Sequence, residues 1–388
     1  MRKKALFAIA SRSGLSNLNP YLRPVHLCVD ARMYRASGIG TYLQNLLPTL
    51  GESFDLILLG NPGELAEVSA QIIPTTIPIY SVAELLRFSR LAPRCDAFWS
   101  PHYNVPWLPV RAKTRLVTIH DVFHLAHLST LSLPQRGYAT LAFRAAARLS
   151  DHIITVSEFS KAEIQHYLNV PDERISVIPN GVNHTLFNAH SEAKRQHAVR
   201  QKYRLPSRWL LYVGNVKPHK NLLTLVRAFA ALPESLSDRH LVIVGQREGF
   251  ITGDIELAQV LQNDPVLAQR IHFTGFVDQA DLPALYGLAE LFVFPSKYEG
   301  FGLPPLEAMA CGCPVVVSDR ASLPEICGAA ADYANADSAL DLADKITAAL
   351  RRSPVERDRK IQLGLERAQQ YTWAKSVAQH ERLIRQSG

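Results

Sequence analysis

The sequence predicts an α/β protein of two doubly wound, Rossmann-like domains that face each other across a cleft. Its 388 residues are enough for two domains. Short apolar segments of strand type alternate with helical segments, a rhythm that is typical of parallel sheets covered by helices on both faces. The rhythm stops in a polar stretch at 188–204 and then begins again. Because such folds bind ligands at the carboxyl ends of their strands, we expect the functional site between the two sheets.

The first domain is predicted over residues 25–190. Its strands are expected at 25–30, 54–59, 97–100, 116–119 and 152–156, and its main helices at 41–50, 133–149 and 161–167. Helical segments between successive strands supply the crossovers that parallel strands require. We interpret residues 1–24 as a loose N-terminal extension, because their apolar run is short and polar residues at 11–13 interrupt it.

The second domain is predicted over residues 191–365. Strands are expected at 209–213, 240–244, 271–274, 291–294 and 315–318, and the polar stretch at 188–204 is interpreted as the connection between the domains. The last segment, 354–384, has a helical pattern. We expect residues 366–388 to form a C-terminal helix that packs back on the first domain.

The composition is that of an ordinary soluble protein, with 47% hydrophobic and 20% charged residues. No apolar run reaches the ~18 residues of a membrane span, and a cytoplasmic location is expected. The cysteines are few and odd in number, which favours reduced thiols over a disulfide framework. Cys311-Gly-Cys313 lacks further ligands for a metal site, so core packing is the preferred interpretation. The five cysteines are Cys28, Cys95, Cys311, Cys313 and Cys327.

The formal charge is +7, from 42 basic and 35 acidic residues. A basic excess attracts nucleic acid, anionic membranes or phosphorylated substrates, but no nucleic-acid motif accompanies it, so no nucleic-acid partner is expected. In the segment 83–94, Arg87, Arg90 and Arg94 recur at helical spacing beside leucines and a phenylalanine. This pattern favours a peripheral contact with the anionic inner face of the cytoplasmic membrane. A solvated basic face on the protein's own domain is the alternative.

The stretch from Pro295 to Glu307 is the most informative one in the chain. It places a Gly-Phe-Gly turn and a Pro-Pro pair between Glu299 and Glu307, directly after an apolar strand. Glycines allow a ligand to approach the backbone, and free amides at the following helix start suit a phosphate. One carboxylate can then face a sugar and the other can bind hydroxyl groups beyond the phosphates. The plainer alternative is that Glu307 complements the helix dipole and Glu299 is a surface residue.

Four weaker signals fall at equivalent strand ends. Gly38-Ile-Gly40 is an incomplete dinucleotide fingerprint and is as easily a structural turn. His120-Asp121 and Pro101-His-Tyr103 follow strands of the first domain, where polar residues favour function over a structural role. Lys220 lies between a strand and a helix of the second domain and can reach a diphosphate as a point charge, unless it is a solvated loop lysine.

These residues together resemble the retaining glycosyltransferases of family 4, which have the GT-B fold. The resemblance covers the chain from about residue 25 onward, and its most specific part is the Glu299–Glu307 stretch. The most similar subgroup builds bacterial O-antigen, capsule or exopolysaccharide chains, often as mannosyltransferases. The supporting motifs are Asp30-Ala-Arg32, Gly38-Ile-Gly-Thr-Tyr42, Thr118-Ile-His-Asp121, Val156-Ser-Glu-Phe-Ser160, Ile178-Pro-Asn-Gly-Val182, Tyr212-Val-Gly214, Pro218-His-Lys-Asn221, Phe273-Thr-Gly-Phe-Val277 and Ala310-Cys-Gly-Cys-Pro-Val-Val-Val-Ser318.

The resemblance implies an acceptor-binding first domain and a second domain that binds a nucleotide sugar. His120, Lys220 and Glu299 would be catalytic: His120 contacts the donor sugar, Lys220 stabilises the departing diphosphate, and Glu299 holds the sugar. Glu307 would bind the ribose hydroxyls. The other implied donor-binding positions are Gly38, Gly40, Asn215, Phe276, Val277, Gly300, Phe301, Gly302 and Leu303. The candidates on the acceptor side are His102, Tyr103 and Asp121.

Two positions depart from the family pattern. Many members carry arginine where this chain has Asn215, and many carry arginine where it has His219. One phosphate-binding cation is therefore missing, and either Lys217 or a neutral contact takes its place.

The implied reaction moves a hexose, mannose being the first expectation, from a nucleotide-diphosphate sugar to a growing, lipid-linked glycan with retention of configuration. The chain has no Asp-x-Asp pair, so Lys220 and the glycine-rich amides are expected to act instead of a metal, and no cofactor is expected. A glycosidase mechanism with two flanking carboxylates fits poorly. Two alternatives stay open. A sugar phosphorylase of the same fold would turn over with phosphate and without nucleotide, and a non-catalytic binder of nucleotide sugars or glycans would need no cation for a leaving group.

Overall fold

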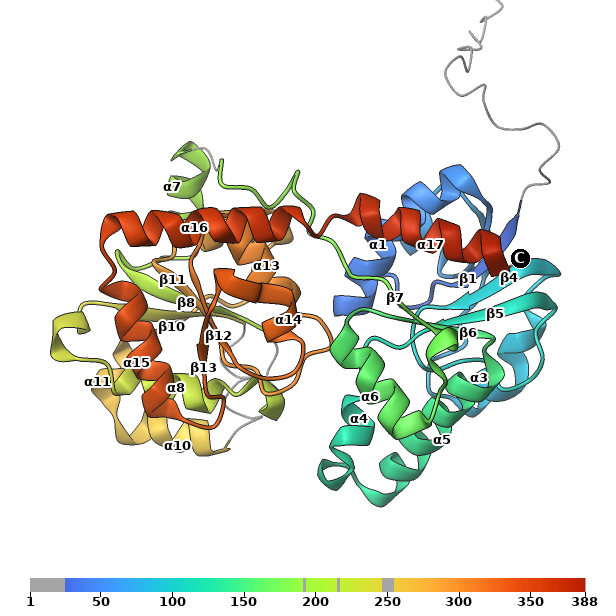
Figure 1. The fold of residues 1–388 in the computed structure, drawn as a ribbon, viewed down its shortest axis with the longest axis horizontal. Helices are drawn as coiled ribbons and strands as arrows, with labels where there is room; N and C mark the ends of the chain where they lie inside the picture. Colours follow the sequence, from blue (N-terminus) through green and yellow to red (C-terminus); the bar gives the residue numbers. More distant parts are fainter. Residues whose placement is uncertain (1–24, 191–192, 215–216, 246–254, 388) are drawn as a thin grey trace, which may run out of the picture.

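The structure, a computed structural model, describes residues 25–190, 193–214, 217–245 and 255–387. The predicted extension 1–24 and Asn215 lie outside these residues. Two lobes lie side by side, and each is built on one parallel sheet (Figure 1).

The sheet of the first domain has seven strands in the order β3-β2-β1-β4-β5-β6-β7, and each paired strand is parallel to its neighbour. The middle strands are nearly continuous runs of buried apolar residues, as expected where helices cover both faces of a sheet. The strands are β1 (His26–Asp30), β2 (Asp55–Gly60), β3 (Gln71–Pro74), β4 (Cys95–Ser100), β5 (Ala112–Thr118), β6 (His152–Thr155) and β7 (Ile175–Val177).

The second domain repeats this design with six parallel strands in the order β10-β9-β8-β11-β12-β13. Its order reverses between β8 and β11, which is the kind of switch point at which doubly wound folds bind ligands. The strands are β8 (Trp209–Val213), β9 (His240–Val244), β10 (Ile271–Phe273), β11 (Leu291–Phe294), β12 (Val315–Ser318) and β13 (Asp332–Ala334).

Helices cover both faces of each sheet. In the second domain α8, α10 and α15 lie together on one face, while α7, α12, α13 and α16 lie together on the other (Figure 1). The helices are α1 (Ser37–Ser53), α2 (Pro62–Leu65), α3 (Val82–Arg87), α4 (Phe123–Ala126), α5 (Leu133–Leu149), α6 (Glu158–Leu168), α7 (Ala193–Lys202), α8 (Leu222–Ala230), α10 (Ile255–Asn263), α11 (Pro265–Gln269), α12 (Leu282–Leu288), α13 (Leu303–Ala310), α14 (Leu323–Cys327), α15 (Ala339–Leu350), α16 (Pro354–Gln369) and α17 (Trp373–Ser387).

Helix α1 corrects one prediction. The residues Ser37 to Gly40, predicted as a turn before a helix, form the first turn of α1 itself. A side chain is excluded at Gly40, because a Cβ there would lie 2.8 Å from the carbonyl oxygen of Tyr34. This glycine therefore serves close backbone packing within the first domain.

The polar stretch at 188–204 contains helix α7 and is not simply a connection. Val199 is buried in the core of the second domain, and Lys202 pairs with Asp278 at 2.6 Å and with Asp281 at 2.7 Å. The helix is polar because charge pairs, rather than a wide apolar face, hold much of it to α12 and the preceding turn.

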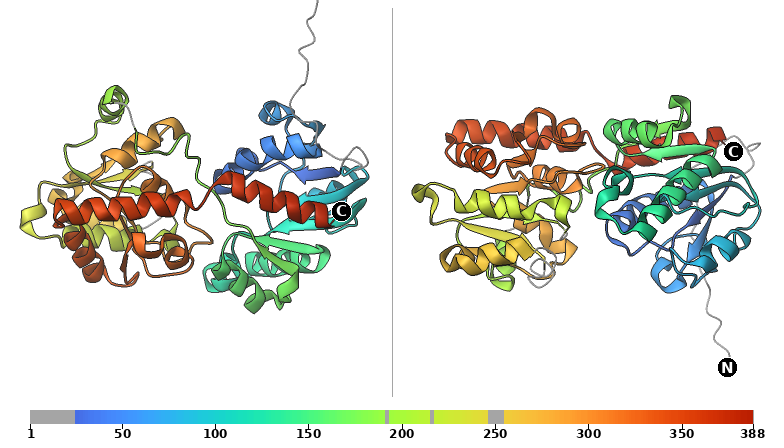
Figure 2. Two further views of the ribbon diagram at one scale, coloured as in Figure 1. Left: turned by 45° about the horizontal axis from the view of Figure 1, so that its top comes forward. Right: turned by 90° about the horizontal axis from the view of Figure 1, so that it is seen from below.

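The C-terminal segment with the predicted helical pattern forms two helices, and the second begins at Trp373 rather than at residue 366. α16 lies on the second domain, and α17 crosses to the first domain and packs beside α1 (Figures 1 and 2). Between them the amide of Val182 donates to the carbonyl of Tyr371 at 3.0 Å, so two chain segments cross from domain to domain side by side. On the first domain, Tyr42 hydrogen-bonds His380 of α17 at 2.6 Å.

Candidate active site at the domain junction

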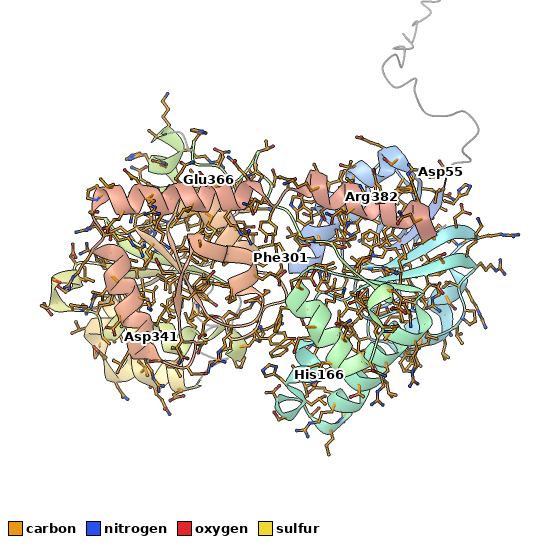
Figure 3. All side chains as sticks on the ribbon, viewed as in Figure 1. Asp55, His166, Phe301, Asp341, Glu366 and Arg382 are labelled. Carbon is orange, nitrogen blue, oxygen red and sulfur yellow. The ribbon has the colours of Figure 1, made fainter. Side chains whose placement is uncertain are left out.

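The junction brings the carboxyl ends of β5 and β6 against those of β8 and β11. The two backbones come very close here: a Cβ added at Gly300, after β11, would lie 2.3 Å from the carbonyl oxygen of His120, after β5. Any side chain at Gly300 would push the domains apart at this point. Phe301, the next residue, lies in Figure 3 where the two domains meet.

Two serines at the start of α6 stabilise this close contact by hydrogen bonds to the backbone carbonyls on both sides. Ser157 Oγ donates to the carbonyl of Gly300 at 2.6 Å. Ser160 Oγ lies 3.0 Å from the carbonyl of His120 and 3.1 Å from that of Gly300. Ser157 also accepts from the amide of Ser160 as the N-cap of α6, so the helix start and the junction share one set of hydrogen bonds.

Lys220 and Glu299 form an ion pair on the second domain's side. The Lys220 ammonium lies 2.7 and 2.9 Å from the two Glu299 oxygens, and both side chains are largely buried. Ser322 Oγ donates to the Glu299 carbonyl at 2.9 Å and fixes the loop that carries the carboxylate. Because the pair is partly desolvated, a ligand that separates it must supply a new partner to each charge: an anion for Lys220 and a hydrogen-bond donor for Glu299.

His120 is a neutral imidazole. Burial lowers its pKa, although the Pro101 carbonyl and the Asp121 carboxylate oppose this shift. Its Nε2 donates to the Pro101 carbonyl at 3.0 Å, which leaves Nδ1 as an acceptor for a hydroxyl group. The Tyr42 ring meets the imidazole edge-on at a centroid distance of 4.9 Å and holds its orientation.

A buried chain of hydrogen bonds supports Tyr42 from behind. Trp99 Nε1 donates to Thr118 Oγ1 at 2.9 Å, and Thr118 Oγ1 lies 3.2 Å from the Tyr42 hydroxyl. The Tyr42 hydroxyl then donates to His380 Nε2, because His380 Nδ1 faces the carbonyl of Ser376 at 2.8 Å. Helix α17 therefore reaches the residue that orients His120.

Glu307 lies in α13, which begins directly after the glycine turn. Burial raises the pKa of Glu307 to about 7, although the Tyr286 hydroxyl opposes this by donating to Oε2 at 3.0 Å. Gly302, the N-cap of α13, has φ +115°, a conformation that favours glycine. Because the pKa of Glu307 is raised, a ligand that donates hydrogen bonds to this carboxyl group would favour its ionised form.

A second set of hydrogen bonds between the domains, called here the Glu325 clasp, was not predicted from the sequence. The Glu325 carboxylate, on α14 of the second domain, accepts from the backbone amides of Glu158 at 2.9 Å and Phe159 at 3.0 Å. These amides are the free donors at the start of α6, which also carries the positive end of the helix dipole. The only available signal was the family motif around Ser157, and it does not name the partner.

An aromatic and histidine cluster lines the junction beside Lys220. The Phe123 ring lies 4.6 Å from His127 and 4.3 Å from His219 across the domain boundary. Burial, together with the charges of Lys220 and Lys217, lowers the pKa of His219 to about 3. His219 is therefore neutral and does not supply the positive charge that the family pattern led us to expect at this position.

The predicted acceptor-side residues lie at different depths. His102 is 1% exposed and lies 3.5 Å from the Asp30 carboxylate, beneath the surface rather than on it. Tyr103 is partly buried and stacks on Phe143 at 4.1 Å. Asp121 accepts from the amide of Phe123 at 3.0 Å and is partly exposed.

The other predicted donor-binding positions are not brought together by contacts in the structure. Gly38 is exposed with open space around it, Phe276 is 77% exposed and Val277 is buried. Leu303 is partly buried at the start of α13. Asn215, beside the Lys220 loop, lies outside the described residues.

A hollow of about 740 Å³ lies away from this junction, at the amino ends of β1, β4 and β5. His26, Arg94, Asp96, Arg111 and Lys113 contribute to its lining. Ligands of doubly wound folds bind at the opposite ends of the strands, so this hollow does not alter the choice of site.

Two protein-family models match successive parts of the chain. A model described as Glycosyltransferase Family 4 matches residues 36–186, and a model described as Glycosyl transferases group 1 matches residues 194–364. The O-antigen chain mannosyltransferase B of Escherichia coli is 33% identical over 281 residues, which cover 70% of this chain and 70% of that protein. The chain belongs to the family-4 glycosyltransferases.

This glycosyltransferase also resembles the serotype-specific mannosyltransferase WbdA of Escherichia coli. The two are 30% identical over 278 residues, which are 71% of this chain but only 33% of WbdA. The chain thus spans about a third of the length of that relative.

Solved structures share the GT-B fold predicted for this glycosyltransferase. HepE of Anabaena in complex with UDP and glucose has a TM-score of 0.76 at 18% identity and covers 93% of this chain and 100% of that one. WaaG, a glycosyltransferase involved in lipopolysaccharide biosynthesis, has a TM-score of 0.70 at 17% identity and covers 93% and 99%. Two doubly wound domains are therefore confirmed as the architecture.

Proposed function

We propose that this family-4 glycosyltransferase transfers mannose from a nucleotide-diphosphate donor to a growing, lipid-linked glycan with retention of configuration. The observation that carries the proposal is the Lys220–Glu299 pair, held at the junction where Gly300 abuts His120. Mannose is favoured because relatives at 30–33% identity are named mannosyltransferases, one of them of the O-antigen chain.

Each side chain supplies one part of the chemistry. When the diphosphate arrives, Lys220 turns from Glu299 to the phosphate and stabilises the negative charge that develops on the leaving group. Glu299 is then free to accept hydrogen bonds from sugar hydroxyls. Neutral His120 offers Nδ1 to another hydroxyl, and so it orients the sugar without adding positive charge beside the oxocarbenium-like centre.

Retention follows if the acceptor enters on the leaving-group side. The bond from the anomeric carbon to the phosphate oxygen breaks, the acceptor oxygen bonds to that carbon, and the acceptor proton passes to the departing phosphate. With the donor bound, Glu299 accepts hydrogen bonds from the sugar hydroxyls in this proposal, so it is not available as a base for attack from the opposite face. A new anomeric centre with inverted configuration, read by proton NMR, would contradict this mechanism.

The first experiment is a thermal-shift panel with GDP, UDP, dTDP and ADP. The correct nucleotide raises the apparent stability by mass action, and radiolabelled transfer with the matching sugar then tests turnover. Turnover that requires inorganic phosphate and no nucleotide would instead identify a sugar phosphorylase. A protein that binds a nucleotide sugar but never transfers the sugar would be a binding protein.

The variant Lys220→Ala tests the assigned cation. We expect its transfer rate to fall by about 100-fold or more, because it removes charge stabilisation from the transition state. Lys297→Ala is the matched control: Lys297 pairs with Asp337 at 2.7 Å on the exposed surface of the same domain. Equal losses in both variants would contradict the role of Lys220.

A peripheral membrane contact through Arg87, Arg90 and Arg94 belongs to the same proposal. All three are exposed, but Phe88 is fully buried with the Arg32 guanidinium 3.7 Å from its ring centroid. The apolar side predicted for this segment is therefore largely turned into the protein. Among the described residues, no helix combines the length and hydropathy needed to span a bilayer.

Co-sedimentation with vesicles that contain anionic lipid tests this contact. Replacement of the three arginines by glutamate should abolish binding that the unmodified protein shows, because each basic residue near an anionic surface contributes about 1 kcal/mol. Equal binding of both proteins would exclude this segment as the contact.

A further inference from the structure

Tyr80 has an unusual backbone conformation on an exposed loop of the first domain. The residue is 52% exposed and has φ +65°. A bulky residue rarely adopts this left-handed region. Such conformations persist where the surrounding structure holds them, and they are concentrated at ligand-binding positions.

A buried charge network holds Tyr80 in this conformation. Glu84 Oε2 accepts from the Tyr80 amide at 2.7 Å, although Glu84 itself is only 1% exposed. Its other oxygen pairs with Arg32, which also pairs with Asp30 at 2.6 Å. Arg32 further donates to the carbonyl of Ile77 at 3.1 Å and so ties down the loop before Tyr80.

Burying charged groups costs free energy unless they are paired, and here Arg32 pairs with both carboxylates. Burial alone would raise the pKa of Asp30, but hydrogen bonds from Arg32 and His102 lower it overall. Three buried charges thus keep the backbone of one exposed aromatic residue in place.

Two more tyrosines support the Tyr80 ring. Its centroid lies 6.3 Å from that of Tyr103 and 6.0 Å from that of Tyr138, the latter edge-on. Burial raises the pKa of Tyr103, and its hydrogen bond with Tyr80 raises it further. Tyr138 donates to Asn104, whose amide donates to Glu84, so the rings and the charge network form one assembly.

The three tyrosines lie on the acceptor side of the candidate site. Tyr80 follows β3 and Tyr103 follows β4, and both therefore lie at the edge of the sheet from which His120 projects after β5. Asp121 lies close enough to raise the pKa of Tyr103 further. The patch thus extends toward Asp121, the neighbour of His120.

We propose that Tyr80, supported by Tyr103 and Tyr138, is a platform for a sugar ring of the acceptor glycan. Aromatic faces pack on the C–H face of a pyranose, and phenol hydroxyls can hydrogen-bond its hydroxyl groups. Because the charge network fixes Tyr80 in advance, little conformational freedom is lost when the sugar binds. The inference rests on the proposed glycosyl transfer and adds the chemistry by which the acceptor is recognised.

A glycan fits this patch better than an apolar partner. The exposed Tyr80 ring carries a hydroxyl group, and a sugar offers the same alternation of apolar and polar surface. The exposed apolar side chains nearby, Val82 and Leu86 (71% and 55% exposed), belong to α3, which begins just after this loop, and not to the tyrosine cluster.

Tyr80→Ala is compared with Tyr80→Phe and with Tyr167→Ala. Tyr167 is the matched control, because it is 39% exposed on the far end of α6. With a short mannose oligosaccharide as acceptor, we expect Tyr80→Ala to raise the acceptor KM about tenfold or more, and Tyr80→Phe to raise it less. The donor KM and the melting shift caused by nucleotide should stay at the unmodified values in all three variants.

The outcomes separate this inference from the proposed function. An unchanged acceptor KM in Tyr80→Ala, with normal transfer, would reject the platform and leave the glycosyl transfer standing. Parallel losses of donor and acceptor binding would show that Tyr80 only maintains the fold, and would reject it too. Loss of vesicle binding in Tyr80→Ala with an unchanged acceptor KM would assign the patch to a membrane. If no nucleotide sugar supports transfer by the unmodified protein, the proposed function fails first and the platform with it.

Discussion

Replacement of Glu307 by glutamine should stabilise the protein at alkaline pH. Burial raises the pKa of this carboxyl group from 4.5 to about 7. Between these two values the folded state keeps a proton that the unfolded state has released, so the free energy of unfolding falls as pH rises through this window. Above about pH 7 the free energy of unfolding has fallen by the full amount. Glutamine keeps the shape of the side chain and cannot ionise, so Glu307→Gln lacks this loss.

The expected size follows from the two pKa values. Their difference corresponds to about 3.5 kcal/mol at ~1.4 kcal/mol for each tenfold change. Glu307 lies in the middle of α13 and is partly exposed, and solvent screening reduces this difference to about 2 kcal/mol. Urea unfolding at pH 5 and pH 8 measures it: Glu307→Gln should gain about 2 kcal/mol relative to the unmodified protein between the two pH values.

The matched control is Glu366→Gln, on the exposed face of α16, which should show no such gain (Figure 3). If Glu307→Gln and the unmodified protein lose stability in parallel from pH 5 to pH 8, the carboxyl group is ordinary and this reasoning is refuted.

The same group should link nucleotide binding to protons. Ribose hydroxyls donate to the ionised carboxylate and favour it, so nucleotide binding at pH 6.5 should release a proton from Glu307. Calorimetry in two buffers with different ionisation enthalpies measures this release, and Glu307→Gln should abolish it. Identical binding enthalpies in both buffers would contradict ribose recognition by Glu307.

Two further experiments address the metal and the junction. Transfer should survive excess EDTA if Lys220 and the glycine-rich amides stabilise the diphosphate, and activity that is lost and then restored by magnesium or manganese would reject that role. Glu325→Gln should weaken the Glu325 clasp at the start of α6 by about 0.5–1 kcal/mol and increase the radius of gyration measured by X-ray scattering. The control Glu366→Gln should leave the radius of gyration unchanged. Equal radii in the unmodified protein and both variants would contradict the clasp.

The strands that sequence reasoning located are the ones with dense apolar runs. β8, β9, β11 and β12 begin and end at the predicted residues. β3, β7 and β13 were missed, because three or four residues at a sheet edge carry too little alternation to stand out.

Single site residues were easier to predict than their partners. Lys220 and Glu299 were each predicted, but their mutual pairing spans 79 residues of sequence and depends on two loop geometries. Glu325 looks like an ordinary acid in the first turn of a short helix, and only the packing of the domains shows that it accepts from amides 166 and 167 residues away. The positive φ of Tyr80 likewise has no local signal, since tyrosine is not a residue that favours it.

Because of helix α17, the first domain can be completed only after the end of the chain has been synthesised. The helix contributes Val377 and Ile384 to the core around α1, and buried His380 completes the hydrogen bonds of Tyr42. During synthesis, the sheet of the first domain leaves the ribosome long before these residues do, and the whole second domain is made in between. The domain that is started first is therefore finished last, and a fragment that stops at the end of the second domain would leave the apolar face of α1 uncovered and Tyr42 without its acceptor.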